Sequence, residues 1–119
     1  MSKIPYLEIT DFESNGRLKK RVGNGKPVVI MVQSSRCGYC VKAKPAYEKL
    51  KNVTNNVFLT YILTDGDESD RKAGLLMSKL DPNFRGVPAY FGFDSSGKFK
   101  KVHNGERDTE SLKVFAHSL

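Results

Sequence analysis

Two cysteines, Cys37 and Cys40, are the residues of this chain best suited to chemistry, and they are its only cysteines. Gly38 and Tyr39 separate them, an apolar run at residues 27–32 precedes them, and a helical pattern follows. The first N–H groups of a helix have no partner within the helix and carry partial positive charge, which favours loss of a nearby thiol proton. The position therefore predicts that Cys37 is a nucleophile.

Cys40 lies one helical turn beyond Cys37 and on the same side of the expected helix. The two sulfurs are then near enough to close a small disulfide ring. We therefore expect Cys37 to attack a target and Cys40 to act as the resolving thiol.

Two other roles for the cysteine pair have to be weighed. A zinc site needs about four ligands, and the remaining side chains with strong zinc preference, His103 and His117, fall in different predicted elements. An inert core pair would more often lie within an apolar run, whereas these cysteines follow the polar residues 34–36. Redox chemistry is the favoured interpretation, and no metal site is predicted.

The length of 119 residues predicts one domain, covering residues 1–119, with a single core. The chain has no apolar run long enough to span a membrane, and residues 1–8 lack the features of a secretory signal. We therefore expect a cytoplasmic protein without membrane association. Thiols are kept reduced in the cytoplasm, where a lone C-x-x-C is more often catalytic than structural.

The net charge of +7 is spread over three basic clusters, at residues 17–21, 42–51 and 98–101. No aromatic residues interleave these clusters in a stacking pattern, so nucleic acid is not an expected partner. The simplest interpretation is a set of solvated faces, and the alternative is a preference for acidic protein partners.

Periodicity and turn residues divide the chain into alternating strands and helices. A nearly continuous apolar run at 28–33 favours a central parallel strand covered on both faces. The acidic turn at 64–68 reads as loop solvation ahead of a helix, and Thr10 with Glu13 forms a capping-box pattern. The predicted strands lie at residues 6–9, 28–33, 57–63, 87–93 and 98–103, and the predicted helices lie at 11–22, after the cysteines, at 69–80 and from 108 or 109. This order, β-α-β-α-β-α-β-β-α, predicts an α/β fold with a mixed sheet and helices on both faces.

That order, with the cysteines after the second strand, resembles the thioredoxin fold over nearly the whole chain, with glutaredoxin and disulfide-isomerase domains as near relatives. Residues 37–40 resemble the C-G-x-C active site of the family, and Pro45 stands five residues beyond, as in its kinked helix. Residues 85–88 resemble the loop that ends in a cis-proline facing the dithiol. Residues 104–105 resemble the glycine turn before the last helix.

The resemblance implies roles for several residues. Val87 and Pro88 would hold the cysteine of a partner in line for attack by Cys37, with the backbone pairing as an added strand does. Gly105 would leave room for the substrate chain. Arg36 replaces the usual tryptophan of thioredoxins, and its fixed positive charge should lower the pKa of the Cys37 thiol further. Gly38 and Tyr39 complete the set expected to tune the thiolate.

Other departures from the family pattern bear on the mechanism. Met31 stands where thioredoxins carry a buried acid, and Tyr61 replaces the lysine often paired with it, so both partners of the buried charged pair are absent. Water or a nearby carboxylate would then accept the proton of Cys40. Tyr39 is shared with many glutaredoxins, but Gly38 replaces their proline and their Gly-Gly pair is missing, which favours protein disulfides over glutathione.

The resemblance therefore implies an enzyme, a monomeric thiol-disulfide oxidoreductase of cell redox homeostasis and electron transport. It would act on protein disulfides or dithiols through Cys37 and Cys40, need no cofactor beyond that redox-active disulfide, and be recycled by a reductase or by glutathione. The direction of electron transfer stays open. Two alternatives are a non-enzymatic binding module that uses the Val87-Pro88 face and the basic surface, and a metal-binding protein.

Overall fold

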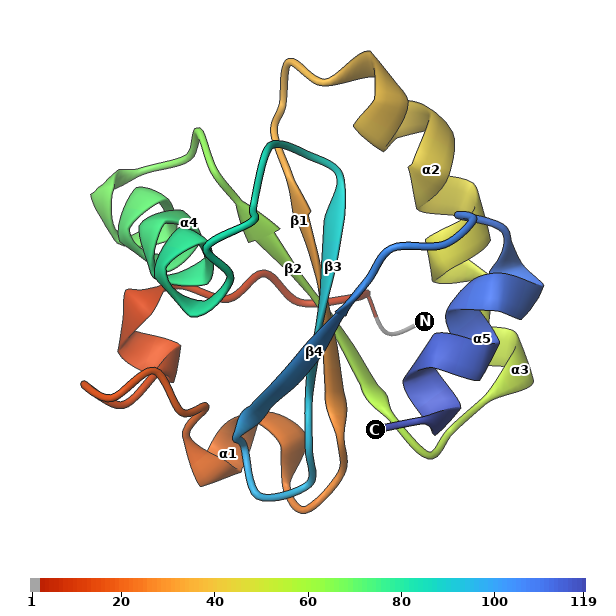
Figure 1. The fold of residues 1–119 in the computed structure, drawn as a ribbon, viewed down its shortest axis with the longest axis horizontal. Helices are drawn as coiled ribbons and strands as arrows, with labels where there is room; N and C mark the ends of the chain where they lie inside the picture. Colours follow the sequence, from red (N-terminus) through yellow and green to blue (C-terminus); the bar gives the residue numbers. More distant parts are fainter. Residues whose placement is uncertain (1–2) are drawn as a thin grey trace.

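Four strands form one mixed sheet in the order β2-β1-β3-β4 (Figure 1). A computed structural model describes residues 3–119; Met1 and Ser2, which belong to the predicted domain and to the segment tested for a signal, lie outside the described residues. β1 is parallel to β2 and antiparallel to β3, and β3 is antiparallel to β4. The strands are β1 (Val28–Gln33), β2 (Phe58–Leu63), β3 (Ala89–Phe93) and β4 (Phe99–His103). The predicted mixed sheet is confirmed.

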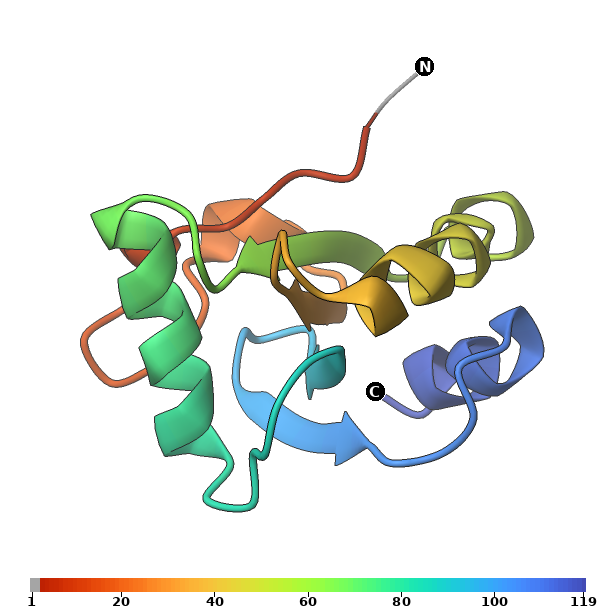
Figure 2. The same ribbon diagram turned by 90° about the horizontal axis from the view of Figure 1, so that it is seen from above.

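Helices cover both faces of this sheet, as the sequence predicts (Figure 2). One face carries α2 (Gly38–Glu48), α3 (Leu50–Val53) and α5 (Thr109–His117). The other carries α1 (Lys20–Gly23) and α4 (Glu68–Leu80). No helix in the described part of the chain has the length and apolar character needed to cross a bilayer.

The central strand β1 is buried along its whole length, which explains its nearly continuous apolar sequence. Val29 and Met31 pack toward α2 and α5, while Val28, Ile30 and Val32 pack toward α4. Burying each such side chain contributes about 1.5–3 kcal/mol. This burial holds the carboxyl end of β1 in place, and Cys37 follows that end after three residues.

The N-terminal segment differs from the prediction of a strand at residues 6–9. Tyr6 forms only an isolated parallel bridge with Tyr61, and the Leu7 N–H donates to the Tyr61 carbonyl at 2.7 Å. A 3-10 turn, η1 (Ile9–Asp11), follows at once and ends the pairing. The element order therefore begins with a bridge beside β2 and a turn, without a full strand.

The predicted helix at residues 11–22 is wrong for most of its length. Gly16 adopts a φ of +89°, which stops a helix, and Phe12 forms an antiparallel bridge with Leu18 as the chain folds back. Both apolar side chains reach the core through this fold-back. The capping box is also displaced, because Glu8 and Asp11 form it where Thr10 and Glu13 were expected.

The later elements follow the sequence prediction to within two residues. β2 begins at Phe58, one residue late, and α4 begins at Glu68, one residue early, because Asp67 caps it by accepting from the Asp70 N–H. Asp108 caps α5 in the same way by accepting from the Ser111 N–H. Strong local signals, apolar runs and capping carboxylates, set these boundaries.

Candidate active site

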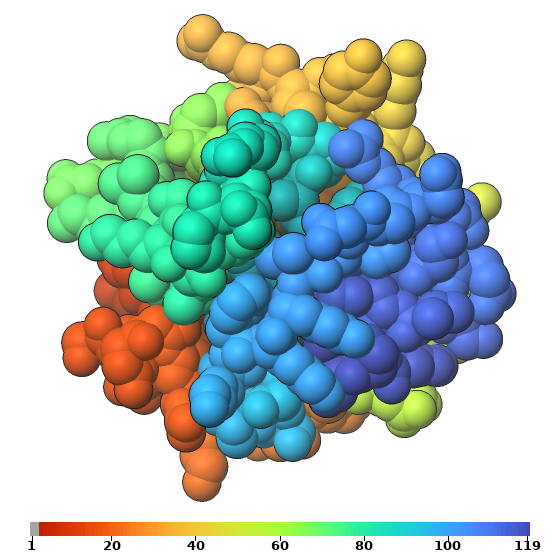
Figure 3. Space-filling view, viewed as in Figure 1, coloured from red at the N-terminus to blue at the C-terminus, as the bar shows by residue number. Residues whose placement is uncertain are grey.

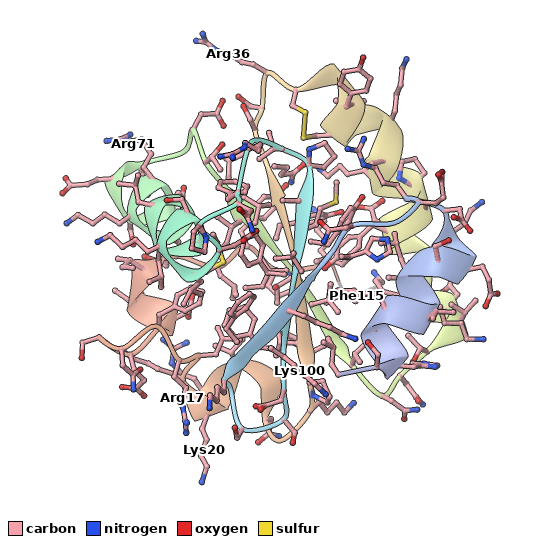
Figure 4. The ribbon with its side chains drawn as sticks, in the orientation of Figure 1. Arg17, Lys20, Arg36, Arg71, Lys100 and Phe115 are labelled. Carbon is pink, nitrogen blue, oxygen red and sulfur yellow. A yellow bond between two sulfur atoms is a disulfide. The ribbon has the colours of Figure 1, made fainter. Side chains whose placement is uncertain are left out.

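Cys37 and Cys40 form a disulfide where β1 ends and α2 begins, seen as the yellow bond in Figure 4. Cys37 is the N-cap of α2, and its Sγ accepts a hydrogen bond from the Cys40 N–H at 3.0 Å. The sulfur therefore sits among the first N–H groups of the helix, where a negative charge is stabilised. This geometry suits a reactive thiolate at Cys37.

The two sulfurs differ in exposure. Cys40 is fully buried, whereas Cys37 is half-buried and flanked by the exposed Arg36 and Gly38. An incoming disulfide can therefore reach Cys37 before Cys40, in line with the order of attack that the sequence predicts.

The loop before β3 places its backbone against Cys37. The Val87–Pro88 peptide bond is cis, as predicted, and the Val87 carbonyl oxygen lies 3.6 Å from Cys37 Sγ. Pro88 is buried and Val87 is half-buried. Both residues thus lie beside the dithiol, where the resemblance expects the substrate to bind.

Gly105 lies in the turn between β4 and α5. A Cβ added at Gly105 would stand 3.0 Å from Cε1 of the His103 ring, so a side chain there would force the imidazole to move. Gly105 and Pro88 line the same hollow, although no contact joins Gly105 to either cysteine.

The residues expected to tune the thiolate are all exposed. The Arg36 side chain extends away from the disulfide into solvent (Figure 4) and forms no ion pair within residues 3–119. Gly38 opens α2, and the Tyr39 ring is 70% exposed. Arg36 can therefore act on Cys37 only as a nearby charge screened by water, so we expect it to lower the pKa of the Cys37 thiol only slightly.

The sequence analysis did not predict the hydrogen bonds that hold the active-site loop to the turn after β2. Ser35 donates to Asp65 from its backbone N–H at 2.9 Å and also from its hydroxyl, and these hydrogen bonds hold the pKa of the Asp65 carboxyl below its usual value. The reading of the acidic turn as solvation alone is therefore incomplete. The predicted strand arrangement could have indicated this contact, because the carboxyl ends of neighbouring parallel strands meet at one edge of a sheet.

The position of the missing buried acid is filled by apolar packing. Met31 is fully buried and pairs across the sheet with Tyr61 on one side and Tyr90 on the other. The Tyr61 hydroxyl donates to Glu48 at 2.9 Å, and burial together with Glu48 raises the pKa of Tyr61. Tyr61 is therefore a neutral donor where the family often has a lysine, and Met31 leaves no buried charge to balance.

The two histidines have partners of their own away from the disulfide. His103 Nε2 donates to the Glu106 carbonyl at 2.6 Å, and His117 Nε2 lies 2.8 Å from the Thr54 hydroxyl. Within residues 3–119 no three metal-binding side chains gather at one point.

Comparison with known proteins adds to this geometry. A family model described as a thioredoxin-like domain matches residues 15–115. The thioredoxin-like protein 453L of Invertebrate iridescent virus 6 is 35% identical to the chain over 100 residues, covering 73% of the chain and 72% of the viral protein.

Solved structures agree on the fold. The J-Trx1 fragment of ERdj5 matches 97% of the chain with a TM-score of 0.67 and 22% identity, and the chain spans 50% of that fragment's length. Thioredoxin O2 from Arabidopsis thaliana, in its oxidized state, has a TM-score of 0.61 and 24% identity, with coverage of 84% of the chain and 81% of the plant protein. Identities this low show the thioredoxin fold alone.

Proposed function

The chain belongs to the thioredoxin-like family, and we propose that it is a thiol-disulfide oxidoreductase acting on protein disulfides. A thioredoxin-like domain with a C-x-x-C pair at disulfide distance supports thiol-disulfide chemistry in general. The observation that carries the finer proposal is the place of Cys37, which caps α2, is partly open to solvent and touches the Val87 carbonyl.

In the reducing direction, the Cys37 thiolate attacks one sulfur of a partner disulfide. A mixed disulfide forms, and the second partner sulfur leaves as a thiolate that takes up a proton. Cys40 then loses its proton and attacks Cys37 Sγ, which releases the first partner sulfur. Two electrons have moved to the partner, and Cys37 and Cys40 are joined as the structure shows. The same steps in reverse oxidise a partner dithiol.

The backbone beside Val87 supports a protein as substrate. An extended partner segment pairing with this stretch, as an added strand would, brings its cysteine sulfur in line with Cys37. Such pairing needs a peptide backbone on the partner. A reductase or glutathione would return the protein to its dithiol form.

The test uses a peptide disulfide with a fluorescent reporter of its reduction. Wild-type protein should reduce it, Cys37→Ser should abolish turnover, and Cys40→Ser should stop at a mixed disulfide that a small thiol reductant releases. Turnover that survives in Cys37→Ser would place the nucleophile elsewhere, and failure of Cys40→Ser to trap any peptide or protein disulfide would refute the mechanism.

The reduction potential of the Cys37/Cys40 pair then decides the direction. Equilibration with glutathione buffers and alkylation of free thiols measures it. A value near about −270 mV indicates an electron donor, and a value above roughly −200 mV indicates an oxidant or isomerase.

A further inference from the structure

A hollow of about 290 Å³ opens directly beside the contact between Val87 and Cys37. Gly86 and Pro88, the neighbours of Val87 on each side, both line it. In Figure 3 the surface is indented between the teal loop that precedes β3 and the blue segment that follows β4. A chain segment docked at Val87 would therefore have the hollow within reach of its next one or two residues, at about 3.3 Å per residue.

Two arginines line this hollow without partners of their own. Arg85 comes from the loop before β3 and Arg107 from the segment before α5, and neither forms an ion pair or a side-chain hydrogen bond within residues 3–119. The one acid among the lining residues is Asp81, whose Oδ1 accepts from the Asn83 N–H. Guanidinium groups match the geometry of carboxylates, so the rim is built to attract an anion.

The inner wall carries a second, independent feature. The Tyr90 hydroxyl is buried and has no hydrogen-bond partner within the described residues, although Tyr90 lines the hollow. Burial raises the pKa of Tyr90 while the charge of Arg107 lowers it, so this guanidinium acts on the hydroxyl. A buried hydroxyl without a partner is costly, and the nearby charge of Arg107 makes this wall of the hollow electropositive.

We propose that this hollow is a carboxylate subsite, which selects protein segments carrying an acidic side chain next to the disulfide that Cys37 attacks. The proposal rests on the proposed function and names its substrate class. Arg85 and Arg107 would pair with the carboxylate while the segment is held at Val87. Specificity would come from charge, because the guanidinium groups favour glutamate or aspartate and repel lysine.

The wider surface favours the same partner. Arg36 and Lys42, which lie on either side of the cysteine pair in the sequence, are exposed, and the chain carries a net charge of +7. An acidic segment is therefore attracted to this positively charged protein before it binds.

The first test compares two disulfide peptides that differ only in having glutamate or glutamine two residues from the target cysteine. Wild-type protein should show a kcat/KM at least about threefold higher for the glutamate peptide, the size expected of two exposed charge pairs. The ratio should fall toward one in Arg85→Gln/Arg107→Gln. The matched control, Arg17→Gln/Lys20→Gln, removes the same charge at the opposite end of the molecule (Figure 4) and should keep the wild-type ratio.

Equal rates for both peptides in wild-type protein, or an equal loss of preference in the control, would overturn the subsite. If the protein neither reduces the disulfide peptides nor oxidises their dithiol forms, the proposed function is overturned instead. The subsite is then decided by binding alone, with fluorescently labelled glutamate and glutamine peptides whose cysteine is replaced by serine. Tighter binding of the glutamate peptide that Arg85→Gln/Arg107→Gln removes would support it.

Glutathione also carries carboxylates, so it is the control for the source of the anion. Oxidised glutathione should compete with the glutamate peptide only at much higher concentration than an unlabelled glutamate peptide does. Competition at equal concentration would assign the hollow to glutathione and overturn the choice of an acidic protein segment.

Discussion

At the scale of single residues, the chemistry depends on what surrounds Cys37. The helix N–H of Cys40 donates to its sulfur, and the Val87 carbonyl stands 3.6 Å away. Arg36 is the nearest fixed charge in sequence, but its side chain extends into solvent. The backbone of α2 therefore supplies the main stabilisation of the thiolate, and Arg36 adds to it.

Replacing Arg36 by alanine should raise the pKa of the Cys37 thiol by a few tenths of a unit, the scale of an exposed charge interaction. The positive charge favours the thiolate, so its removal favours the protonated thiol. The rate of iodoacetamide alkylation against pH, in the reduced protein, measures the shift. Lys20→Ala, remote from the site, is the control, and an Arg36→Ala curve that matches wild type would refute the role given to Arg36.

At the scale of elements, the active-site loop is held by its neighbours. Asp65, after β2, accepts two hydrogen bonds from Ser35, and the Thr64 N–H donates to the Gln33 carbonyl at the end of β1. These contacts join the ends of two parallel strands, and they lie two residues (Ser35) and four residues (Gln33) before Cys37. The position of the nucleophile thus depends on an element that is distant in sequence.

The stability that the Ser35–Asp65 hydrogen bonds contribute should depend on pH, because these bonds hold the pKa of Asp65 below its usual value. A carboxyl with a lowered folded pKa contributes stability above its unfolded pKa of about 3.9, and this is lost as pH falls through the folded pKa. Asp65→Ala should therefore lower the thermal unfolding midpoint at pH 7, and this effect should shrink as the pH falls below the unfolded pKa and through the folded one.

The control for this experiment is Glu13→Ala, which removes an exposed carboxylate without a side-chain hydrogen bond in the described residues. Glu13→Ala should leave the midpoint nearly unchanged over the same pH range. An Asp65→Ala defect of equal size across that range would show that charge and hydrogen bonding at Asp65 are not its source.

At the scale of the whole molecule, a hydrophobic core cluster lies on each face of the sheet, and a buried hydroxyl positions α2 against the strands. Tyr47 is fully buried on α2; its hydroxyl has the carbonyls of Thr60 and Val29 within reach of its one proton, at 2.7 and 3.0 Å, and accepts from the Thr60 N–H. One hydroxyl therefore ties α2 to both β1 and β2. Burial raises the pKa of Tyr47, so the hydroxyl keeps its proton at physiological pH.

Tyr47→Phe should lower the free energy of unfolding by about 1–3 kcal/mol, because the Thr60 N–H is left buried without its partner. That is a substantial share of a typical total of about 5–15 kcal/mol. Urea unfolding measures it, with Tyr39→Phe as a control because the Tyr39 ring is 70% exposed. Equal stability of Tyr47→Phe and wild type would mean that water or a neighbour replaces the lost hydroxyl.

The sequence by itself determined the features that local patterns encode. The apolar run of β1, the approximate starts of the helices near residues 69 and 108, and the spacing of Cys37 and Cys40 each depend on a few neighbouring residues, so the sequence alone predicts them. The family pattern added the cis bond before Pro88. The helix expected at residues 11–22 is wrong because the capping-box pattern of Thr10 and Glu13 favoured a helix where Gly16 adopts a positive φ and turns the chain.

Only the tertiary structure decided which distant segments meet. The hydrogen bonds of Ser35 to Asp65, the approach of Val87 to Cys37, and the gathering of Arg85 and Arg107 around one hollow all join residues that are far apart along the chain. No local pattern encodes such contacts, because they arise when parallel strands bring their carboxyl ends to one edge and a loop crosses beside them. The position of Cys37 at a helix start follows from the sequence, and the surface offered to its substrate follows from the fold.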